Sequence, residues 1–307
     1  MLSSSTTEPK LAFTSLCIWP AYGALPSFDP ECLCVLAHFA FSRLNADIKT
    51  NLGRFAYMKE HLPLLLGDSD KICLASGYEA IADHCKKSHI DIDEQFSTDT
   101  ADLLALNALV KSAFVPAVLD TFWLDDTYRT AIINIYGRSL GGFPLAFIYG
   151  KQTTERIKNQ FSITYGDNNF EQTRKTIFEK GKKVLDHLTL LLGTKPFLFG
   201  ASPTSVDAFV FGYLAPLIHG PASNSGLARY ASSRKNLRDF VNRILTVYLG
   251  HLATDNQTTD SAPTTVPKKP TEDRLRDKLA VIGVGILTMC AYAYFSGLIR
   301  IEISQVE

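Results

Sequence analysis

In the N-terminal third of the chain, short apolar runs alternate with amphipathic stretches. Short apolar runs bounded by turn residues predict strands, and apolar positions about three or four residues apart predict helices. Asp29, Pro30 and Glu31 indicate a helix start with Asp29 as the N-cap. Gly67-Asp68-Ser69-Asp70 indicates a hairpin turn. The predicted elements are, in order, strand 11–19, helix 31–44, strand 47–50, an optional helix, strands 62–66 and 71–75, and helix 78–87.

From Asp99 onward the strand signals nearly vanish and helical periodicity takes over. Pro116 is expected to kink or split the first of these helices, because proline removes a backbone donor. The stretch after Gly250 is polar and rich in Thr and Pro, which predicts a flexible tether. The predicted helices are 100–122, 152–161, 170–192, 205–218 and 236–248.

The C-terminal segment 279–299 reads LAVIGVGILTMCAYAYFSGLI and contains no charge. At about 1.5 Å per residue it makes a helix of roughly 31 Å, enough to cross a bilayer core. A buried core helix is the alternative, but Gly283, Gly285 and Gly297 would each weaken a water-soluble helix. The predicted anchor residues are Leu279, Val281, Ile282, Ile286, Leu287, Tyr292, Phe295, Leu298 and Ile299.

Charge and cysteine usage agree with a body that faces the cytosol. The net charge is zero, so composition does not indicate a nucleic-acid partner. The N-terminus is polar and does not resemble a secretory signal, which predicts insertion of the tail after synthesis. Basic residues precede the predicted span, as expected on its cytosolic side. None of the six cysteines lies between Lys86 and Met289, so no disulfide framework is expected.

These signals divide the chain into six parts. They are a flexible N-terminus 1–10, an α/β domain 11–95, an all-helical domain 96–250, a polar linker 251–278, a transmembrane tail anchor 279–299 and a C-terminal tail 300–307.

One helix start is marked specifically, at Pro203-Thr204-Ser205-Val206-Asp207. Thr204 as N-cap can accept from the amide of Asp207, and the Asp207 carboxylate can reach back to the amide of Thr204. The helix that follows is apolar almost all round, so we expect it to cross a core. Thr204 and Asp207 are therefore predicted as a structural helix cap.

The order of elements is that of a thioredoxin-like domain followed by a helical domain, which resembles the glutathione transferase fold. A narrower resemblance, to the metaxin family of the tail-anchored type, spans about residues 11–250. It is carried by four segments, Gly23-Ala24-Leu25-Pro26-Ser27-Phe28-Asp29, Thr121-Phe122-Trp123-Leu124-Asp125, Gly142-Phe143-Pro144-Leu145 and Ser205-Val206-Asp207-Ala208-Phe209-Val210-Phe211-Gly212-Tyr213-Leu214.

The resemblance implies a protein of the mitochondrial outer membrane whose body faces the cytosol. It implies a role in protein import within the sorting and assembly machinery that inserts β-barrel proteins. The implied partners are a second, anchorless metaxin and the β-barrel subunit of that machinery. A further implied role is that of an adaptor, with motor-adaptor proteins as partners, in mitochondrial transport. No catalytic residue, cofactor or metal is expected.

The rival interpretation is a tail-anchored glutathione transferase-like enzyme. That chemistry needs a group just after the first strand that holds the glutathione thiolate, and only Cys17 and Tyr22 are available. We expect Cys17 to be a small buried residue of a strand and Tyr22 a loop aromatic. Pro63 matches a proline of the transferases that is commonly cis. Ser76 of their peptide-binding turn is present, but Ala75 before it cannot hold glutathione.

Other candidate residues have plain structural interpretations. Cys32 and Cys34 are two apart on a helix and point to different sides, so they form neither a redox pair nor a metal clip. His84 and His89 are expected to interact with carbonyls at a helix end. The helical half also carries prominent aromatics, which either pack in the core or line a groove for a partner. They are Phe122, Trp123, Tyr136 and Tyr149.

Overall fold

The computed structural model describes residues 13–50, 62–67, 72–142, 144–166 and 170–255. The predicted linker beyond residue 255 and the predicted anchor 279–299 lie outside the described residues. The described part belongs to one compact unit, Met1–Thr259. The sheet half and the helical half are therefore parts of the same unit.

The N-terminal half contains a four-stranded mixed sheet with the order β2-β1-β3-β4. The central strand β1 pairs in parallel with β2, Leu16 lying opposite Ile48, and antiparallel with β3, where Leu16 faces Leu65. The predicted strands are all present, although they are shorter than the sequence pattern indicated. The peptide bond Leu62–Pro63 before β3 is cis. The strands are β1 (Phe13–Cys17), β2 (Asp47–Lys49), β3 (Leu64–Gly67) and β4 (Cys73–Ser76).

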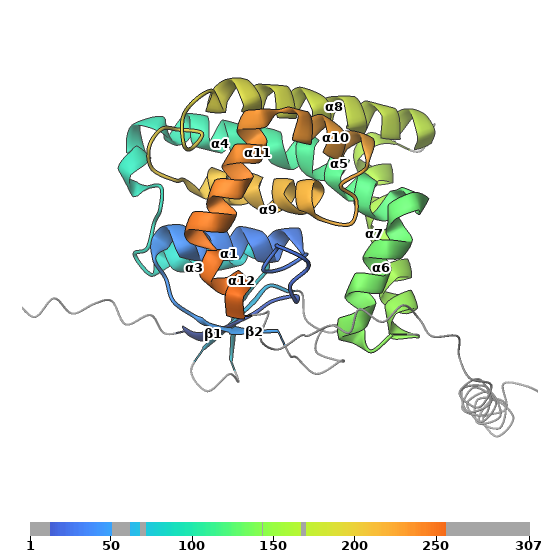
Figure 1. Cartoon of the computed structure of the whole chain (residues 1–307), viewed down its shortest axis with the longest axis horizontal. Helices are drawn as coiled ribbons and strands as arrows, with labels where there is room; N and C mark the ends of the chain where they lie inside the picture. Colours follow the sequence, from blue (N-terminus) through green and yellow to red (C-terminus); the bar gives the residue numbers. More distant parts are fainter. Residues whose placement is uncertain (1–12, 51–61, 68–71, 143, 167–169, 256–307) are drawn as a thin grey trace, which may run out of the picture. The chain divides into compact units, whose positions relative to one another are not determined.

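Helices α1 (Pro30–Ser42) and α3 (Tyr78–Lys87) lie between the strands and the helical half (Figure 1). Asp29 caps α1 as predicted, since its Oδ1 accepts from the Cys32 amide at 3.0 Å. The α1 ladder ends at Arg43, which adopts a left-handed conformation with φ 55°. Helix α3 begins and ends where the sequence predicted. The optional helix between β2 and β3 lies outside the described residues.

The helical half begins after α3 and continues to residue 255. Its predicted helices are all present, and α8 has the predicted ends. Three α-helices that the sequence did not predict, α6, α10 and α12, are added. The last of them occupies the first residues of the predicted polar linker 251–278. The elements are η2 (Glu94–Asp99), α4 (Thr100–Leu109), η3 (Val110–Phe114), α5 (Val115–Leu119), η4 (Asp120–Leu124), α6 (Asp126–Leu140), α7 (Leu145–Tyr165), α8 (Phe170–Leu192), α9 (Ser205–His219), α10 (Gly226–Ser233), α11 (Lys235–Arg243), η5 (Ile244–Tyr248) and α12 (Gly250–Asp255).

Pro116 does not end its helix. The turn before it, η3, is π-helical: the amide of Val115 donates to the carbonyl of Val110, five residues earlier, and not to a carbonyl four residues earlier as in an α-helix. The whole stretch Thr100–Leu124 is long and apolar enough to cross a membrane by length and composition, among the described residues searched. Its buried face packs on α8 and α9, with Phe114 and Val118 fully buried. That packing accounts for its apolar character without a membrane.

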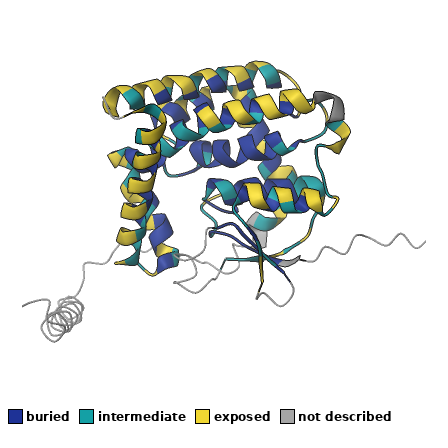
Figure 2. Ribbon diagram, turned by 180° about the vertical axis from the view of Figure 1, so that it is seen from behind, coloured by how far each residue is buried: buried dark blue, intermediate teal, exposed yellow. Residues whose placement is uncertain are grey.

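Helix α9 crosses the core and packs along α1 over much of its length (Figure 1). The two backbones approach so closely that a Cβ on Gly212 would lie 2.2 Å from the Cys34 sulfur and 2.7 Å from the Pro30 oxygen. The Cys34 thiol donates to the carbonyl of Phe209 across this contact, at 3.6 Å. Buried residues gather on the inward sides of the helices (Figure 2). The α1–α9 contact thus joins the two halves through one core.

Candidate functional site

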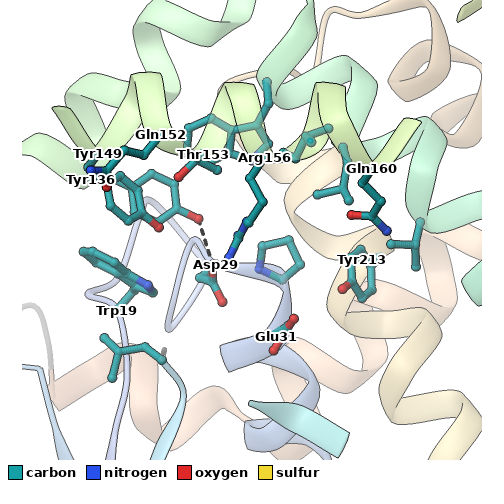
Figure 3. Close-up of a pocket in the computed structure, with 16 residues that line it drawn as sticks. Trp19, Asp29, Glu31, Tyr136, Tyr149, Gln152, Thr153, Arg156, Gln160 and Tyr213 are labelled. Atoms are coloured by element: carbon teal, nitrogen blue, oxygen red, sulfur yellow. Dashed lines mark hydrogen bonds between the residues drawn. The ribbon is translucent and has the colours of Figure 1, made fainter. Parts of the chain in front are cut away.

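A cavity of about 600 Å³ opens where the start of α1 faces α5, η4 and α7 (Figure 3). We call it the junction cavity. Its size is that of a small-molecule site. Its lining comprises Trp19, Asp29, Pro30, Glu31, Leu62, Val115, Leu119, Trp123, Tyr136, Tyr149, Gln152, Thr153, Arg156, Ile157, Gln160 and Tyr213.

One side of the junction cavity is a wall of aromatic rings. Tyr136 stands edge-on to Trp19, with ring centroids 4.6 Å apart, and lies 5.2 Å from Tyr149. Trp123 lies 5.3 Å from Tyr136. Trp123 and Tyr136 are buried, and Tyr149 is half-buried. Three of the four aromatics singled out in the sequence therefore meet here, while Phe122 is buried and does not line the cavity.

The start of α1, which faces this wall, already carries a carboxylate. Asp29 caps the helix through Oδ1, and its Oδ2 accepts from the Tyr136 hydroxyl at 2.8 Å (Figure 3). Burial raises the pKa of Tyr136 well above its usual value, and the neighbouring Asp29 charge raises it further. Tyr136 is therefore a neutral donor that holds the Asp29 carboxylate in place. An incoming thiolate would have to displace this arrangement.

The start of α3 is occupied in the same way, by a residue of α1. Glu31 Oε2 accepts from the Tyr78 amide at 3.3 Å. The same oxygen lies 3.3 Å from where a Cβ on Gly77 would stand. Ser76, the residue that matches the transferase peptide-binding turn, directly precedes this glycine. The positive end of α3 thus faces the protein's own carboxylate.

These two carboxylates make the junction cavity unfavourable for an anion such as glutathione. Like charges about 4 Å apart repel by roughly 4 kcal/mol at an effective dielectric constant of about 20. Among the described residues that line the cavity, the basic side chain is that of Arg156, which reaches in from α7 (Figure 3). Burial raises the pKa of Tyr149, a change that Asp29 reinforces and Arg156 opposes. The cavity is therefore aromatic and neutral to acidic.

The residues weighed as transferase nucleophiles do not line the cavity. Cys17 is fully buried in β1, and Tyr22 is a half-buried loop residue paired with Leu25. Cys32 accepts from the Trp19 amide, whereas Cys34 faces α9, so the two thiols point to different sides as predicted. Burial raises the pKa of both thiols well above the usual value. Neither is an activated thiolate.

No cluster of metal-binding side chains occurs in the part of the chain that the structure describes. His84 lies in the last turn of α3, and His89 follows it in a left-handed conformation with φ 64°. The His89 amide donates to the carbonyl of Lys86.

The capping box at the start of α9 has the predicted geometry. Asp207 Oδ2 accepts from the Thr204 amide at 2.9 Å, and the Asp207 amide donates to Thr204 Oγ1 at 3.3 Å. The other Asp207 oxygen accepts from the Leu198 amide at 2.9 Å, which ties in the preceding loop. Burial raises the pKa of Asp207 to about 6, although its hydrogen bonds oppose the shift.

A second carboxylate at this helix start was not anticipated. Asp93 Oδ1 accepts from the Ser205 amide at 2.8 Å, and its Oδ2 accepts from the Ser205 hydroxyl. Tyr78 adds a hydrogen bond from its hydroxyl to the Ser205 carbonyl, at 3.1 Å. Asp93 is 112 residues away in sequence, so no local pattern could have indicated the pair. The start of α9 is thus held by residues from both halves.

Models of two known protein families match the chain. The one described as "Outer mitochondrial membrane transport complex protein" matches residues 32–154. The one described as "Glutathione S-transferase, C-terminal domain" matches residues 181–244. Together they take in the sheet half from α1 onward, the part of the aromatic wall formed by Trp123, Tyr136 and Tyr149, and the chain from the middle of α8 to the end of α11.

The chain is also similar to curated proteins. Metaxin-1 of Mus musculus is 24% identical over 288 residues, which cover 92% of this chain and 90% of that protein. Metaxin-3 of Xenopus laevis is 29% identical over 234 residues, 75% of each chain. A Metaxin-1 homolog of Caenorhabditis briggsae is 28% identical over 94% of this chain and 97% of its own length.

Solved structures include similar chains at low identity. A glutathione S-transferase of Ceriporiopsis subvermispora in complex with glutathione is 14% identical, with a TM-score of 0.47, over 81% of this chain and 100% of that one. Glutathione S-transferase III in its apo form is 16% identical, with a TM-score of 0.44, over 83% and 99%.

A four-stranded mixed sheet joined to a helical half that matches the transferase C-terminal model defines a protein of the glutathione transferase-like fold class. Within this fold class, the chain is similar to metaxins along most of its length. The predicted resemblance to the metaxin family is confirmed by these relatives and by the match of residues 32–154.

Proposed function

We propose that this chain is a non-enzymatic subunit of the sorting and assembly machinery of the mitochondrial outer membrane. It acts there in protein import and in the insertion of β-barrel proteins. The observation that carries the proposal is the match of residues 32–154 to a family described as an outer mitochondrial membrane transport complex protein, together with the metaxin relatives.

The absence of an enzymatic role is part of this proposal. The starts of α1 and α3 are the places where a transferase would attract the charges of glutathione. Here Asp29 and Glu31 occupy them. Cys17 is buried in a strand, and Tyr22 does not line the cavity. These contacts support a fold that has kept the transferase architecture without its chemistry.

The proposal includes a membrane anchor at 279–299, with the body on the cytosolic side. The support is the uncharged sequence of this segment and the basic residues before it. The proposed partners are a second, anchorless metaxin and the β-barrel subunit of the machinery. Motor-adaptor proteins are a third partner class, for a role in mitochondrial transport.

A native pull-down of the tagged full chain from mitochondria tests the assignment. We expect the β-barrel subunit and a second metaxin to co-purify. A variant with Gly285→Asp and Leu287→Asp should lose carbonate-resistant membrane binding, because charges near the centre of a span cost several kcal/mol. Full-chain protein that is folded and on mitochondria but recovers neither partner would contradict the assignment. Location of the chain in the secretory pathway would contradict the proposed localisation to the mitochondrial outer membrane.

Calorimetry of the full chain with glutathione separates this function from its rival, a tail-anchored glutathione transferase-like enzyme. We expect no micromolar binding, because Asp29 and Glu31 occupy the helix starts. Micromolar binding that Cys17→Ala abolishes would overturn the non-enzymatic interpretation.

A further inference from the structure

Basic side chains gather where α8 ends and α11 begins. They surround a second, more open pocket of about 550 Å³, which we call the basic pocket. Four basic residues line it, Lys195, Arg234, Lys235 and Arg243, against one carboxylate, that of Asp239. The basic pocket shares no lining residue with the junction cavity. Its excess of positive charge stands out in a chain with zero net charge.

Most of this positive charge is not neutralised by carboxylates within the described residues. Lys195 Nζ donates to the Leu198 carbonyl at 2.7 Å, and the Arg243 guanidinium donates to the carbonyl of Pro196. Carbonyl oxygens satisfy hydrogen bonds but carry no net charge. Among the basic residues of the pocket only Arg234 forms an ion pair there, with Asp186 at 2.6 Å.

Near the start of α8, in the same half, the charge of Arg174 is neutralised by a carboxylate. Arg174 donates through Nε and Nη2 to the two oxygens of Asp120, at 2.7 and 3.1 Å. Both side chains of that pair are largely shielded from solvent. In the basic pocket, by contrast, Lys195 and Lys235 are both exposed, whereas Arg234 and Arg243 are half-buried.

Exposed aliphatic side chains lie close in sequence to residues that line the basic pocket. Leu190, next to the lining residue Thr189, is 81% exposed. Val247, one turn after Arg243, is 69% exposed. A cluster of cations bordered by exposed aliphatic groups suits an interface in which the cations meet headgroups and the aliphatic groups enter the acyl boundary. A soluble anion would use the cations alone.

We propose that the basic pocket and its two aliphatic neighbours form a surface that rests on an anionic phospholipid membrane. The length of chain between α12 and the predicted span is consistent with a membrane as the binding partner of this surface. The described chain ends at residue 255, soon after α11, and 23 residues of predicted linker, 256–278, separate it from the predicted span. A flexible chain of that length has an end-to-end distance on the order of 25 Å. The lipid surface is then present at high effective concentration, so weak contacts suffice.

The proposal rests on the proposed anchor for how the surface is presented, but the contact can be tested separately. The full chain, with Cys73→Ser and Cys290→Ser, is reconstituted into phosphatidylcholine vesicles with and without phosphatidylinositol. A fluorophore is attached through Ser233→Cys, in the basic pocket, or through Thr127→Cys, at the exposed start of α6. Quenching by a spin-labelled lipid headgroup reports proximity to the membrane.

We expect strong quenching at position 233 only with phosphatidylinositol, loss of quenching at high salt, and little quenching at position 127. The pair Lys195→Glu and Lys235→Glu should abolish the effect. The matched pair Lys87→Glu and Lys151→Glu, on exposed lysines of α3 and α7, should leave it intact. Equal quenching at both positions, indifference to lipid charge, or displacement by millimolar inorganic phosphate would overturn the proposal.

Different experimental outcomes would refute the proposed anchor and the proposed membrane-binding surface. If the chain does not insert, sedimentation with preformed anionic vesicles tests the surface alone. Each cation at a membrane surface contributes about fivefold in affinity, so reversing two lysines should weaken binding by roughly 25-fold or more. Binding with that sensitivity supports the surface and refutes the anchor. An inserted chain without quenching at position 233, or a chain that does not sediment, refutes the surface.

Discussion

At the junction of the two halves, the starts of α1, α3 and α9 each receive a carboxylate, from Asp29, Glu31 and the pair Asp93 and Asp207. The start of α11 differs. Its N-cap is Arg234, no side chain caps it, and cations surround it. Because helix starts carry partial positive charge, the first arrangement is stabilising and closed to anions. The second leaves positive potential facing outward.

The two regions differ in where positive charge is available. The helix starts at the junction of the halves are closed to anions, whereas the basic pocket presents positive charge to solvent. A transferase keeps its helix starts available for a charged ligand. In this chain the corresponding positions are used internally, where the carboxylates join elements that are distant in sequence. Positive charge available to a partner is instead found on α11 and the end of α8. Changes at the two regions should therefore have opposite effects on stability and binding.

The largest expected effect concerns the α9 cap. Asp207→Ala removes acceptors of the buried Thr204 and Leu198 amides. Each stranded donor costs about 1–3 kcal/mol, so the free energy of unfolding should fall by roughly 3–4 kcal/mol. Denaturant unfolding followed by circular dichroism measures it. Thr204→Ser is the control, because it keeps the hydroxyl and should cost under about 0.5 kcal/mol. A loss below 1 kcal/mol for Asp207→Ala would contradict the assigned role.

Next in size is a pH effect at His38, buried on α1 beside Tyr78. Burial lowers the pKa of His38 to about 4, which Asp91 partly opposes. A lowered histidine pKa means that the unfolded chain binds the proton more tightly. The stability contributed by neutral His38 is therefore present above pH 6.5 and is lost as the pH falls toward 4. At pH 5 the loss is about 2 kcal/mol.

Relative to the original chain, His38→Phe should gain about 2 kcal/mol between pH 7.5 and pH 5, as read from unfolding midpoints. Asp207 acts in the opposite sense. Its raised pKa, about 6, makes the folded chain take up a proton as the pH falls through 6 toward 3.8. Because both proteins contain Asp207, its contribution cancels in the difference between their free energies of unfolding. An equal pH dependence with and without His38 would refute the assignment.

A smaller effect is expected at the start of α1. Asp29→Ala removes the cap and the acceptor of the buried Tyr136 hydroxyl, so the loss should be about 1–2 kcal/mol. Tyr136→Phe removes only the hydroxyl and should cost about 1 kcal/mol. In a double-mutant cycle the two changes should be non-additive, because they break the same hydrogen bond. Strict additivity would mean that the Asp29–Tyr136 bond contributes nothing.

The smallest effect has the opposite sign and lies at the start of α11. Lys235→Glu places a negative charge at the first position of the helix, so stability should rise by about 0.3–1 kcal/mol. Arg238→Glu is the matched control, since it makes the same charge change beyond the first turn and should gain less. The melting temperature at low salt measures both. A stability loss for Lys235→Glu, with none for Arg238→Glu, would contradict the account of an uncapped helix start.

Much of the fold could be predicted from the sequence, because its signals are local. The ends of α3 and α8, the Asp29 cap and the capping box at Thr204 follow from residues within about one turn. Helix α6 was missed although its ends are marked by the Asp125 cap and by Gly141 with φ 82°. Its β-branched and aromatic residues have weak helix propensity, so packing in the helical half decided its structure.

The junction cavity could be predicted only in part. Its aromatic residues were visible in the sequence as prominent side chains, yet nothing indicated which of them line a cavity. Phe122 and Trp123 are adjacent, but only Trp123 lines the cavity. The π-helical turn η4 carries both residues. The rotation of a helix about its axis, which selects between neighbours, depends on the elements packed around it.

By itself, the sequence determined the order of the strands and of most helices, the α9 cap and the family resemblance, because each depends on neighbouring residues or on segments read in order. The tertiary structure alone decided which carboxylate meets which helix start. Asp29 and Tyr136 are 107 residues apart, Glu31 and Tyr78 are 47 apart, and Asp93 and Ser205 are 112 apart. Such pairs form only once elements distant in sequence pack together, since hydrogen bonds require contact within about 3 Å.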